Sequence, residues 1–438
     1  MNNKFRKILL MVDMLALASL VFTACLDVSK LEEKPTTDDG ICTSHTYGEW
    51  TYSEGFDCYL GGSKTHKCTA CGEEETVTVE KKAEHTPDEA GYCKICGALN
   101  GLDLVLNSAE TEYTVATFWG NAVDIVLPST YNGLPITRIG MNSFGKSSMK
   151  SIVIPDTVRR IEESAFHTCL ELEAVTVGNG VTIIVDNAFQ NCPKLKKVVM
   201  GNSVTDIGNG VFYGCASLSD ITISQSIKRI GNNLFNGCSS LTEFTIPDGV
   251  TSVGPYAFAS CISLESVYIP DSVTGIGAFA FSDCRKLSDV KLPSDLKQIS
   301  PNTFSKCYSL AGITLPETLV GIGNYAFADC TMLYEIKLPN SVINLGVYAF
   351  SNCTNLKNVT FSNQITSIPV KAFTNCSALD GITIPASVSR IYASAFEGCT
   401  GLETVYYGGS GDFWSVVAVE ENNDPLHNAT ITKAPDGK

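Results

Sequence analysis

Two pairs of closely spaced cysteines in the first part of the chain are of the kind that binds a metal ion. Residues 68–72 (CTACG) and 93–97 (CKICG) are both C-x-x-C-G sequences. Such a turn directs two thiolates toward one tetrahedral metal ion, usually zinc. Three of the chain's five histidines lie in the same segment, at His45, His66 and His85. Disulfide bonds could also stabilise a segment this short, and a fold that needs neither a metal ion nor a disulfide is a third alternative.

Residues 41–98 resemble zinc-ribbon-like units of exported bacterial proteins, whose pattern is H-x-Y-G-x-W followed by single and paired cysteines. The resemblance implies two zinc sites. The implied ligands are His45, Cys58, Cys68 and Cys71 for one site, and His85, Cys93, Cys96 and a suggested Cys42 for the other. A catalytic zinc would keep an open position and usually a nearby carboxylate base. No acidic residue is tied to either site by its spacing, so we expect structural zinc.

A second set of cysteines recurs at a constant interval through the rest of the chain. Each has a phenylalanine three residues before it and a leucine three residues after it. These cysteines, each 23 residues from the next, are Cys169, Cys192, Cys215, Cys238, Cys261, Cys284, Cys307, Cys330, Cys353, Cys376 and Cys399. Redox or metal chemistry would require exposed thiols with a low pKa. Small apolar side chains that all point the same way suit a packing column better, and their geometry is poor for disulfides.

The segment between two such cysteines predicts one coil of a repeat. In residues 261–270 (CISLESVYIP), Val267 and Ile269 alternate with polar residues, which is typical of a half-buried strand ended by Pro270. Gly277 then permits a turn, and we expect a short helical or 3₁₀ segment from Ala280 to Cys284. One coil cannot close a core, but stacked coils can.

The whole pattern resembles the bacterial BspA-like leucine-rich repeat family, whose unit reads C-x-x-L-x-x-V-x-I-P-x-x-V-x-x-I-G-x-x-A-F. The resemblance covers about residues 122–407 and implies an α/β repeat solenoid, a right-handed coil with a parallel sheet, in about twelve coils. The first coil departs from it, because Lys146 replaces the cysteine and Phe144 is one residue out of phase.

The N-terminal sequence predicts export. A basic start and an apolar stretch are typical of a signal segment, and residues 22–25 (FTAC) resemble a bacterial lipobox. We expect lipidation of Cys25 and a cell-surface location, with secretion as the alternative. The expected segments are 1–25 (signal), 26–40 (polar tether), 41–98 (zinc-ribbon-like module), 99–145 (N-terminal cap and first coil), 146–402 (repeats) and 403–438 (C-terminal cap).

Composition and motifs narrow the classes of function. The net charge of −15 argues against nucleic acid as a partner, because phosphates require a basic surface. No nucleophile elbow, phosphate loop or H-E-x-x-H motif occurs. Outside residues 1–98 the histidines are His167 and His427. We therefore expect no enzyme, and a hydrolase is unsupported.

Binding is the function that the expected solenoid favours. Strand positions between the inward residues should point outward and contact a protein or glycan. The candidate ligand-binding residues are Tyr268, Lys291, Lys337, Glu243, Asp289 and Glu335. The family resemblance implies adhesion or recognition of host proteins. A structural spacer of the cell envelope is the alternative, and we expect a monomer.

Overall fold

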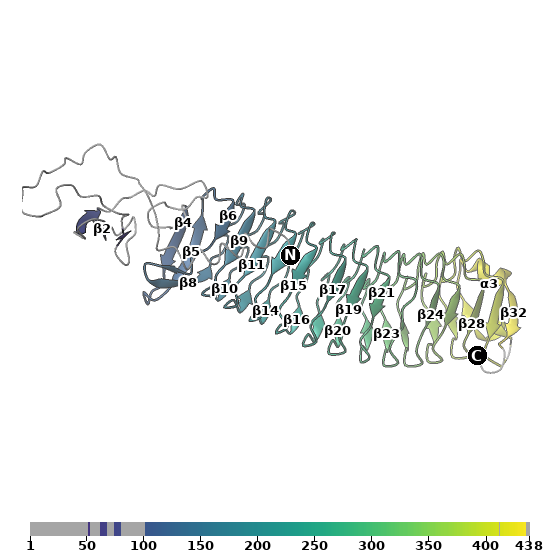
Figure 1. Ribbon diagram of the computed structural model, residues 1–438. Coiled ribbons are helices and arrows are strands. Elements are labelled where there is room, and N and C mark those ends of the chain that lie inside the picture. Colours follow the sequence, from purple (N-terminus) through teal and green to yellow (C-terminus); the bar gives the residue numbers. More distant parts are fainter. Residues whose placement is uncertain (1–50, 53–61, 68–73, 80–100, 411, 435–438) are drawn as a thin grey trace, which may run out of the picture. The chain divides into compact units, whose positions relative to one another are not determined.

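The computed structural model describes residues 51–52, 62–67, 74–79, 101–410 and 412–434. The chain divides into two compact units. The smaller comprises residues 1–102, 120–123 and 130–135, and the larger comprises residues 103–119, 124–129 and 136–438. The larger unit contains the repeats (Figure 1).

The smaller unit contains a three-stranded antiparallel sheet. Its strands are β1 (Thr51–Tyr52), β2 (Gly62–Lys67) and β3 (Glu74–Val79), in the order β1-β2-β3. His66 and Glu75 are paired across β2 and β3, with 2.8 Å between Nε2 and Oε2. Residues 130–135 contribute a hairpin, with β7 (Thr130–Tyr131) antiparallel to the start of β8 (Leu134–Ile139). The turn between them has positive φ at Asn132 and Gly133.

The larger unit is a solenoid with two ladders of short, mostly parallel strands. The first ladder contains β6 (Asp124–Val126), β9 (Ser151–Ile154), β11 (Ala174–Val177), β13 (Lys197–Val199), β15 (Asp220–Thr222), β17 (Glu243–Thr245), β19 (Ser266–Tyr268), β21 (Asp289–Lys291), β24 (Glu335–Lys337), β26 (Asn358–Thr360), β28 (Gly381–Ile384), β30 (Thr404–Tyr407) and β32 (Thr430–Lys433). These thirteen strands and one coil without a strand, at residues 311–314, make fourteen turns in the described part, against the twelve coils expected. The additional turns come from the two caps.

The second ladder lies on another side of the same coils (Figure 1). It contains β4 (Leu102–Leu106), β5 (Tyr113–Phe118), β8, β10 (Arg160–Ile161), β12 (Ile183–Ile184), β14 (Asp206–Ile207), β16 (Arg229–Ile230), β18 (Ser252–Val253), β20 (Gly275–Ile276), β22 (Gln298–Ile299), β23 (Gly321–Ile322), β25 (Asn344–Leu345), β27 (Ser367–Ile368), β29 (Arg390–Ile391) and β31 (Ala418–Val419). The sequence predicts one sheet and gives no sign of this second one. A two-residue strand with one inward side chain is too short for alternation to reveal it.

The expected strand is confirmed after every repeat cysteine except Cys307. In β19, Val267 is buried while Tyr268 is exposed, and the strand ends before Pro270. Val267 lies opposite Phe244 on one neighbouring coil and Val290 on the other, so the register between coils is one period of 23 residues. The parallel-sheet solenoid that the repeat predicts is therefore present.

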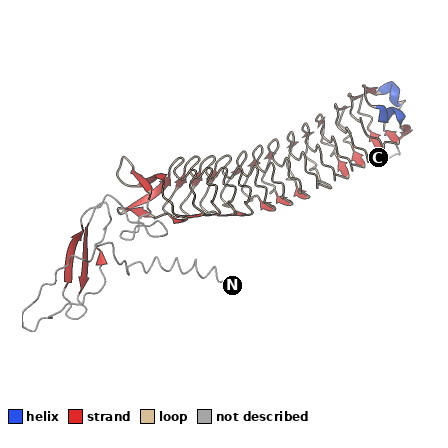
Figure 2. Cartoon of the chain, turned by 90° about the horizontal axis from the view of Figure 1, so that it is seen from above, coloured by secondary structure: helices blue, strands red, loops and turns tan. Residues whose placement is uncertain are grey.

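The helical or 3₁₀ segment expected before each cysteine is a series of turns instead. Phe279 and Asp283 both have φ near +60°, a left-handed conformation that interrupts a right-handed helix. Gly277, in contrast, has no positive φ. A side chain there would overlap the backbone nitrogen of Pro255 on the preceding coil, so close stacking requires this glycine. The described helices are α2 (Phe413–Val416) and α3 (Asp424–Asn428), at the C-terminal cap (Figure 2).

The core is built from columns of identical side chains. The repeat phenylalanines are fully buried and stacked on their neighbours, with ring centroids 5.3 Å apart for Phe258 and Phe281. Each repeat cysteine is also buried, and its thiol donates a hydrogen bond to a phenylalanine carbonyl, as from Cys261 to Phe235 at 3.2 Å. The predicted packing column of cysteines is therefore present.

The first coil keeps the phenylalanine column through a local shift. Phe144 stacks on Phe166 at 5.0 Å although it is one residue out of phase. The shift also moves the position that corresponds to the cysteine. Lys146 has the positive φ of Thr168, the residue before Cys169, so Ser147 rather than Lys146 stands in the cysteine's place.

Candidate binding surface

The outward side of the first ladder carries the residues proposed from sequence for ligand binding. A central stretch from β17 to β24 has one buried side chain in each strand, and its neighbours are exposed except for the half-buried Ser266. The exposed residues include Glu243, Tyr268, Asp289, Lys291, Glu335 and Lys337. We call this set the central face. All six side chains are thus on one side of the sheet and accessible to a partner.

Two rows cross the central face along the stack. Ser266 pairs in register with Glu243 and Asp289, so the acids occupy the first position of their strands. Tyr268 pairs with Lys291, and Lys337 has the same third position in β24. An acidic row of Glu243, Asp289 and Glu335 therefore runs beside a row of Tyr268, Lys291 and Lys337.

Charges on neighbouring coils are neutralised by ion pairs between coils. Lys197 and Asp220 approach to 2.6 Å, and Lys196 and Glu173 to 2.7 Å. The pKa of Glu173 is lowered, chiefly by the hydrogen bond from Lys196. Beyond the central face, Lys357 lies 3.1 Å from Asp380, and this hydrogen bond raises the pKa of the lysine.

The central face lacks such pairing within the part of the chain that the structure describes. None of the side chains of Glu243, Asp289, Lys291, Glu335 and Lys337 forms an ion pair or hydrogen bond there. Lys291 makes a minor contribution to lowering the pKa of Asp271, after the hydrogen bonds from Ser294. These charges therefore remain open to a partner outside the chain.

A low strip separates the two charged strands β21 and β24. Residues 311–314 form no strand, and Gly312 is exposed, with no heavy atom within 4 Å of the place that a Cβ atom would occupy. Ala311 and Thr314 are also small, and neither is buried. A partner could thus contact the charged residues on both sides without meeting a bulky side chain between them.

Three exposed residues beside the central face were missed from sequence. Tyr334 is 50% exposed, Met332 is 52% exposed and Tyr308 is 36% exposed. Met332 and Tyr334 precede β24, and Tyr308 precedes the coil without a strand, so simple alternation makes no prediction for them. Their signal is a departure from the repeat, because the matching positions on other coils hold mostly small or charged residues.

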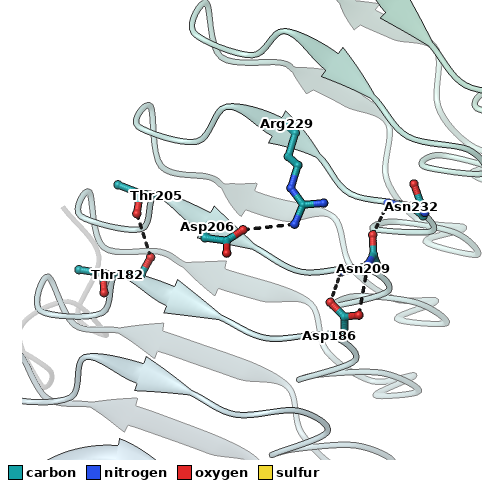
Figure 3. A network of polar contacts seen from close by, with 7 residues as sticks. All are labelled: Thr182, Asp186, Thr205, Asp206, Asn209, Arg229 and Asn232. Carbon is teal, nitrogen blue, oxygen red and sulfur yellow. Dashed lines mark hydrogen bonds and ion pairs between the residues drawn. The ribbon is translucent and has the colours of Figure 1, made fainter.

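A separate polar network joins coils near the second ladder (Figure 3). The backbone N–H of Asn209 donates to Asp186 Oδ1 at 2.8 Å, and that of Asn232 donates to Asn209 Oδ1 at 2.9 Å. Arg229 and Asp206 approach to 3.3 Å. These groups bind one another from coil to coil, so the network stabilises the stack. Its polar groups are therefore less available to a ligand than those of the central face.

The other sites predicted from sequence lie outside the described residues. They are Cys25 and the eight implied zinc ligands. Within the described ranges, no group of three or more His, Cys, Asp or Glu side chains is arranged to hold a metal ion. No helix in these ranges is long and apolar enough to cross a bilayer.

The thiol column has no sign of reactivity. Burial raises the pKa of the Cys261 and Cys330 thiols well above the usual range, which disfavours the thiolate. His167 is half-buried at the edge of the first coils, and its Nδ1 lies 2.9 Å from the Ser164 carbonyl oxygen. Both observations agree with structural roles.

Comparison with solved structures identifies similar solenoids. A leucine rich cell surface protein from Faecalibacterium prausnitzii A2-165 is 28% identical, with a TM-score of 0.50, over 73% of this chain and 96% of that protein. A leucine-rich repeat protein from Bacteroides ovatus ATCC 8483 is 25% identical, with a TM-score of 0.49, over 74% and 99%. The pneumococcal vaccine antigen PcpA is 19% identical, with a TM-score of 0.49, over 77% and 98%.

Comparison with family models gives a direct assignment. No curated protein matches the chain. The model described as BspA type leucine rich repeat region matches residues 137–261, 228–330 and 297–415, which together cover more than half of the sequence. The family resemblance that the cysteine, phenylalanine and leucine positions indicated is therefore confirmed. This chain belongs to the BspA-type leucine-rich repeat family.

Proposed function

We propose that this protein is exposed on the cell surface and binds a macromolecular partner through the central face. The observation that carries the proposal is the contrast between charges: those on adjoining coils pair with each other, whereas those of the central face do not. Unpaired charges of both signs on a rigid sheet favour an electrostatically complementary protein surface. The F. prausnitzii protein is described as a cell surface protein, which supports the proposed location.

The size of the central face fits a macromolecule better than a small molecule. Strands in a sheet lie about 4.8 Å apart, so Glu243 and Glu335, four coils apart, are separated by roughly 19 Å. The face is a sheet surface, whereas small ligands are usually enclosed in concave, mostly apolar pockets. A protein surface, or an extended glycan, could contact both charged strands at once.

The proposal predicts that reversing the lysine charges weakens binding. We expect the double variant K291E/K337E to bind at least about tenfold more weakly to whichever ligand is captured, because each close charge pair contributes about 1.5 kcal/mol or more at a protein interface. Biolayer interferometry against purified extracellular-matrix proteins and arrayed glycans measures this.

The matched control is K297E, which makes the same charge change at an exposed lysine beside β22, in the second ladder. It should bind as the unaltered chain does. Saturable binding that K291E/K337E leaves unchanged would place the site elsewhere. Absence of saturable binding across the panel would favour the structural spacer.

For the N-terminal segment we propose two structural zinc ions, held by the cysteines and histidines of residues 41–98. The two C-x-x-C-G sequences and the zinc-ribbon resemblance support this. Elemental analysis of the purified full chain should give about two zinc ions per chain, and C68S/C71S should lose one. A zinc content below one per chain, together with disulfide-linked peptides in mass spectrometry, would show that disulfides hold the segment instead.

A further inference from the structure

We propose that the partner of the central face is a second copy of this chain, bound face to face with its coils in the same order and its strands antiparallel. The inference rests on the proposed function, since it assigns an occupant to the same surface. It follows from the order of charges within each strand and from the symmetry operation that would bring two such faces together.

Two strands of the central face carry an acid and a lysine at matching places. β21 presents Asp289 and Lys291 on either side of the buried Val290, and β24 presents Glu335 and Lys337 on either side of Ile336. In each strand the acid comes first. Because outward residues i and i+2 lie about 7 Å apart along a strand, each strand has a fixed acid-to-base direction across the sheet.

A twofold axis along the direction of stacking makes this pattern complementary to itself. Rotation about that axis keeps the order of the coils and reverses the strands, so every coil faces its equivalent with first and third positions exchanged. Asp289 then faces the partner copy's Lys291, and Glu335 faces the partner copy's Lys337. The same contacts occur in reverse, which gives four opposite-charge pairs, as an isologous interface requires.

The other in-plane twofold axis gives the opposite result. An axis along the strands, centred on Gly312, keeps the strand direction and reverses the order of the coils. Asp289 would then face Glu335, and Lys291 would face Lys337, so all four contacts would join like charges. Electrostatics therefore selects one of the two face-to-face arrangements.

The neighbouring coils allow the favoured arrangement. Between the charged strands, Gly312 would face Thr314, so the low strip leaves room for approach. In the strands on either side, the facing pairs would be Ser266 with Tyr268 and Asn358 with Thr360, which are uncharged. From β13 to β26, none of the described strands would bring two like charges face to face.

The expected association is weak for a single pair of molecules. The strands from β17 to β26 extend about 24 Å along the stack, and an outward strip three residues wide covers only a few hundred Å². Stable interfaces bury about 800 Å² on each partner. Many copies held on a surface would nevertheless associate, because simultaneous contacts add avidity. High salt should weaken the contact, since its charges lie at a hydrated surface.

Charge reversal in two complementary variants tests the proposal. D289K/E335K makes both strands wholly basic at these positions, and K291E/K337E makes them wholly acidic. Full-length chain is coated on beads of two colours at low salt, and clustering is counted, while sedimentation equilibrium measures association in solution. We expect the unaltered chain to self-associate, and each variant alone to lose about tenfold or more in association constant. A one-to-one mixture of the two variants should recover it and cluster beads of different colour together.

The swapped chain D289K/K291D/E335K/K337E is a further check, because it restores opposite charges in each facing pair and should self-associate. K297E is the control for charge alone and should behave as the unaltered chain. Self-association that both double variants retain, or a variant mixture that stays dispersed, would overturn the twofold arrangement.

The two proposals can fail separately. If the unaltered chain stays monomeric and its beads stay dispersed, the inference of a second copy is wrong. Binding of an extracellular-matrix protein that K291E/K337E abolishes would still support the proposed function in that case. Absence of both self-association and saturable foreign binding would contradict the two together.

Discussion

At the scale of single residues, the repeat separates side chains that build the stack from those that face solvent. Phe281 is fully buried and stacks on Phe258 and Phe304, with centroids 5.3 and 5.6 Å away. Phe279, two residues earlier, is half-buried and stacks only on Tyr256, at 4.6 Å. The sequence could distinguish them, because Phe281 recurs in every repeat and Phe279 does not.

This difference predicts unequal costs for the same substitution. F281A should lower the free energy of unfolding by about 3–5 kcal/mol, because it leaves a cavity in the column. F279A should cost about 1.5 kcal/mol or less, since it removes one partly exposed aromatic contact. Urea unfolding followed by circular dichroism measures both. Equal losses for the two variants would mean that the phenylalanine column is not the main source of core stability.

At the scale of the coil, two left-handed residues replace the expected helix. Phe279 and Asp283 have positive φ, and the equivalent residues of the next coil, Asn302 and Lys306, repeat this. Some coils have glycine at these places, as at Gly237. A single coil does not reveal this conformation readily, because phenylalanine and lysine are not residues from which a positive φ is expected, although the Asn, Asp and Gly residues at the same places in other coils favour it.

A lysine in a left-handed conformation predicts a stabilising substitution. Lys306 has φ 62° and is exposed, and the same place in other coils holds Gly214, Gly237 and Gly398. A non-glycine residue in this conformation lowers the free energy of unfolding by about 1–2 kcal/mol. Glycine relieves this strain but offsets roughly 0.5–1 kcal/mol of the gain, because it makes the unfolded chain more flexible. K306G should therefore raise the free energy of unfolding by up to about 1 kcal/mol in thermal or urea unfolding.

The alanine variant K306A is the control for loss of the lysine side chain. It keeps a Cβ and so keeps the strain, and it should not be more stable than the unaltered chain. If K306A stabilised the chain as much as K306G, backbone strain would not be the cause.

At the scale of the whole molecule, the buried thiols link stability to pH. Burial raises the pKa of the thiols of Cys261, Cys284 and Cys307, and the same holds for four further central cysteines. Folded thiols thus stay protonated at a pH where unfolded thiols, with a pKa of about 8.5, ionise. The stability that they contribute is complete below that pH and is lost progressively above it.

The melting temperature should accordingly fall as the pH is raised from about 8 to about 10. Each thiol that ionises only on unfolding contributes up to about 1.4 kcal/mol per pH unit. The triple variant C261A/C284A/C307A should show a shallower fall in differential scanning calorimetry, since tyrosine and lysine titrate equally in both chains. Parallel curves for the two chains would contradict the linkage.

The sequence alone was sufficient to predict the 23-residue period, the buried columns, the strand after all but one of the repeat cysteines and the outward placement of the central face. These features repeat every 23 residues, so the same local pattern of buried and exposed residues can be recognised in each coil. The tertiary structure was needed for the second ladder, the left-handed turns and the first-coil shift to Ser147.

The tertiary structure was also needed to show which charged side chains lack an ion-pair partner among the described residues. Lys197 and Asp220 meet across adjacent coils, whereas Asp289 and Lys291 have no such partner among the described residues. Whether a lysine reaches an acid depends on the register and direction of side chains on neighbouring coils, which composition and spacing do not specify. The physical reason is that the sequence of one coil determines which of its residues are buried, whereas the pairing of charges depends on how side chains of different coils are placed relative to one another.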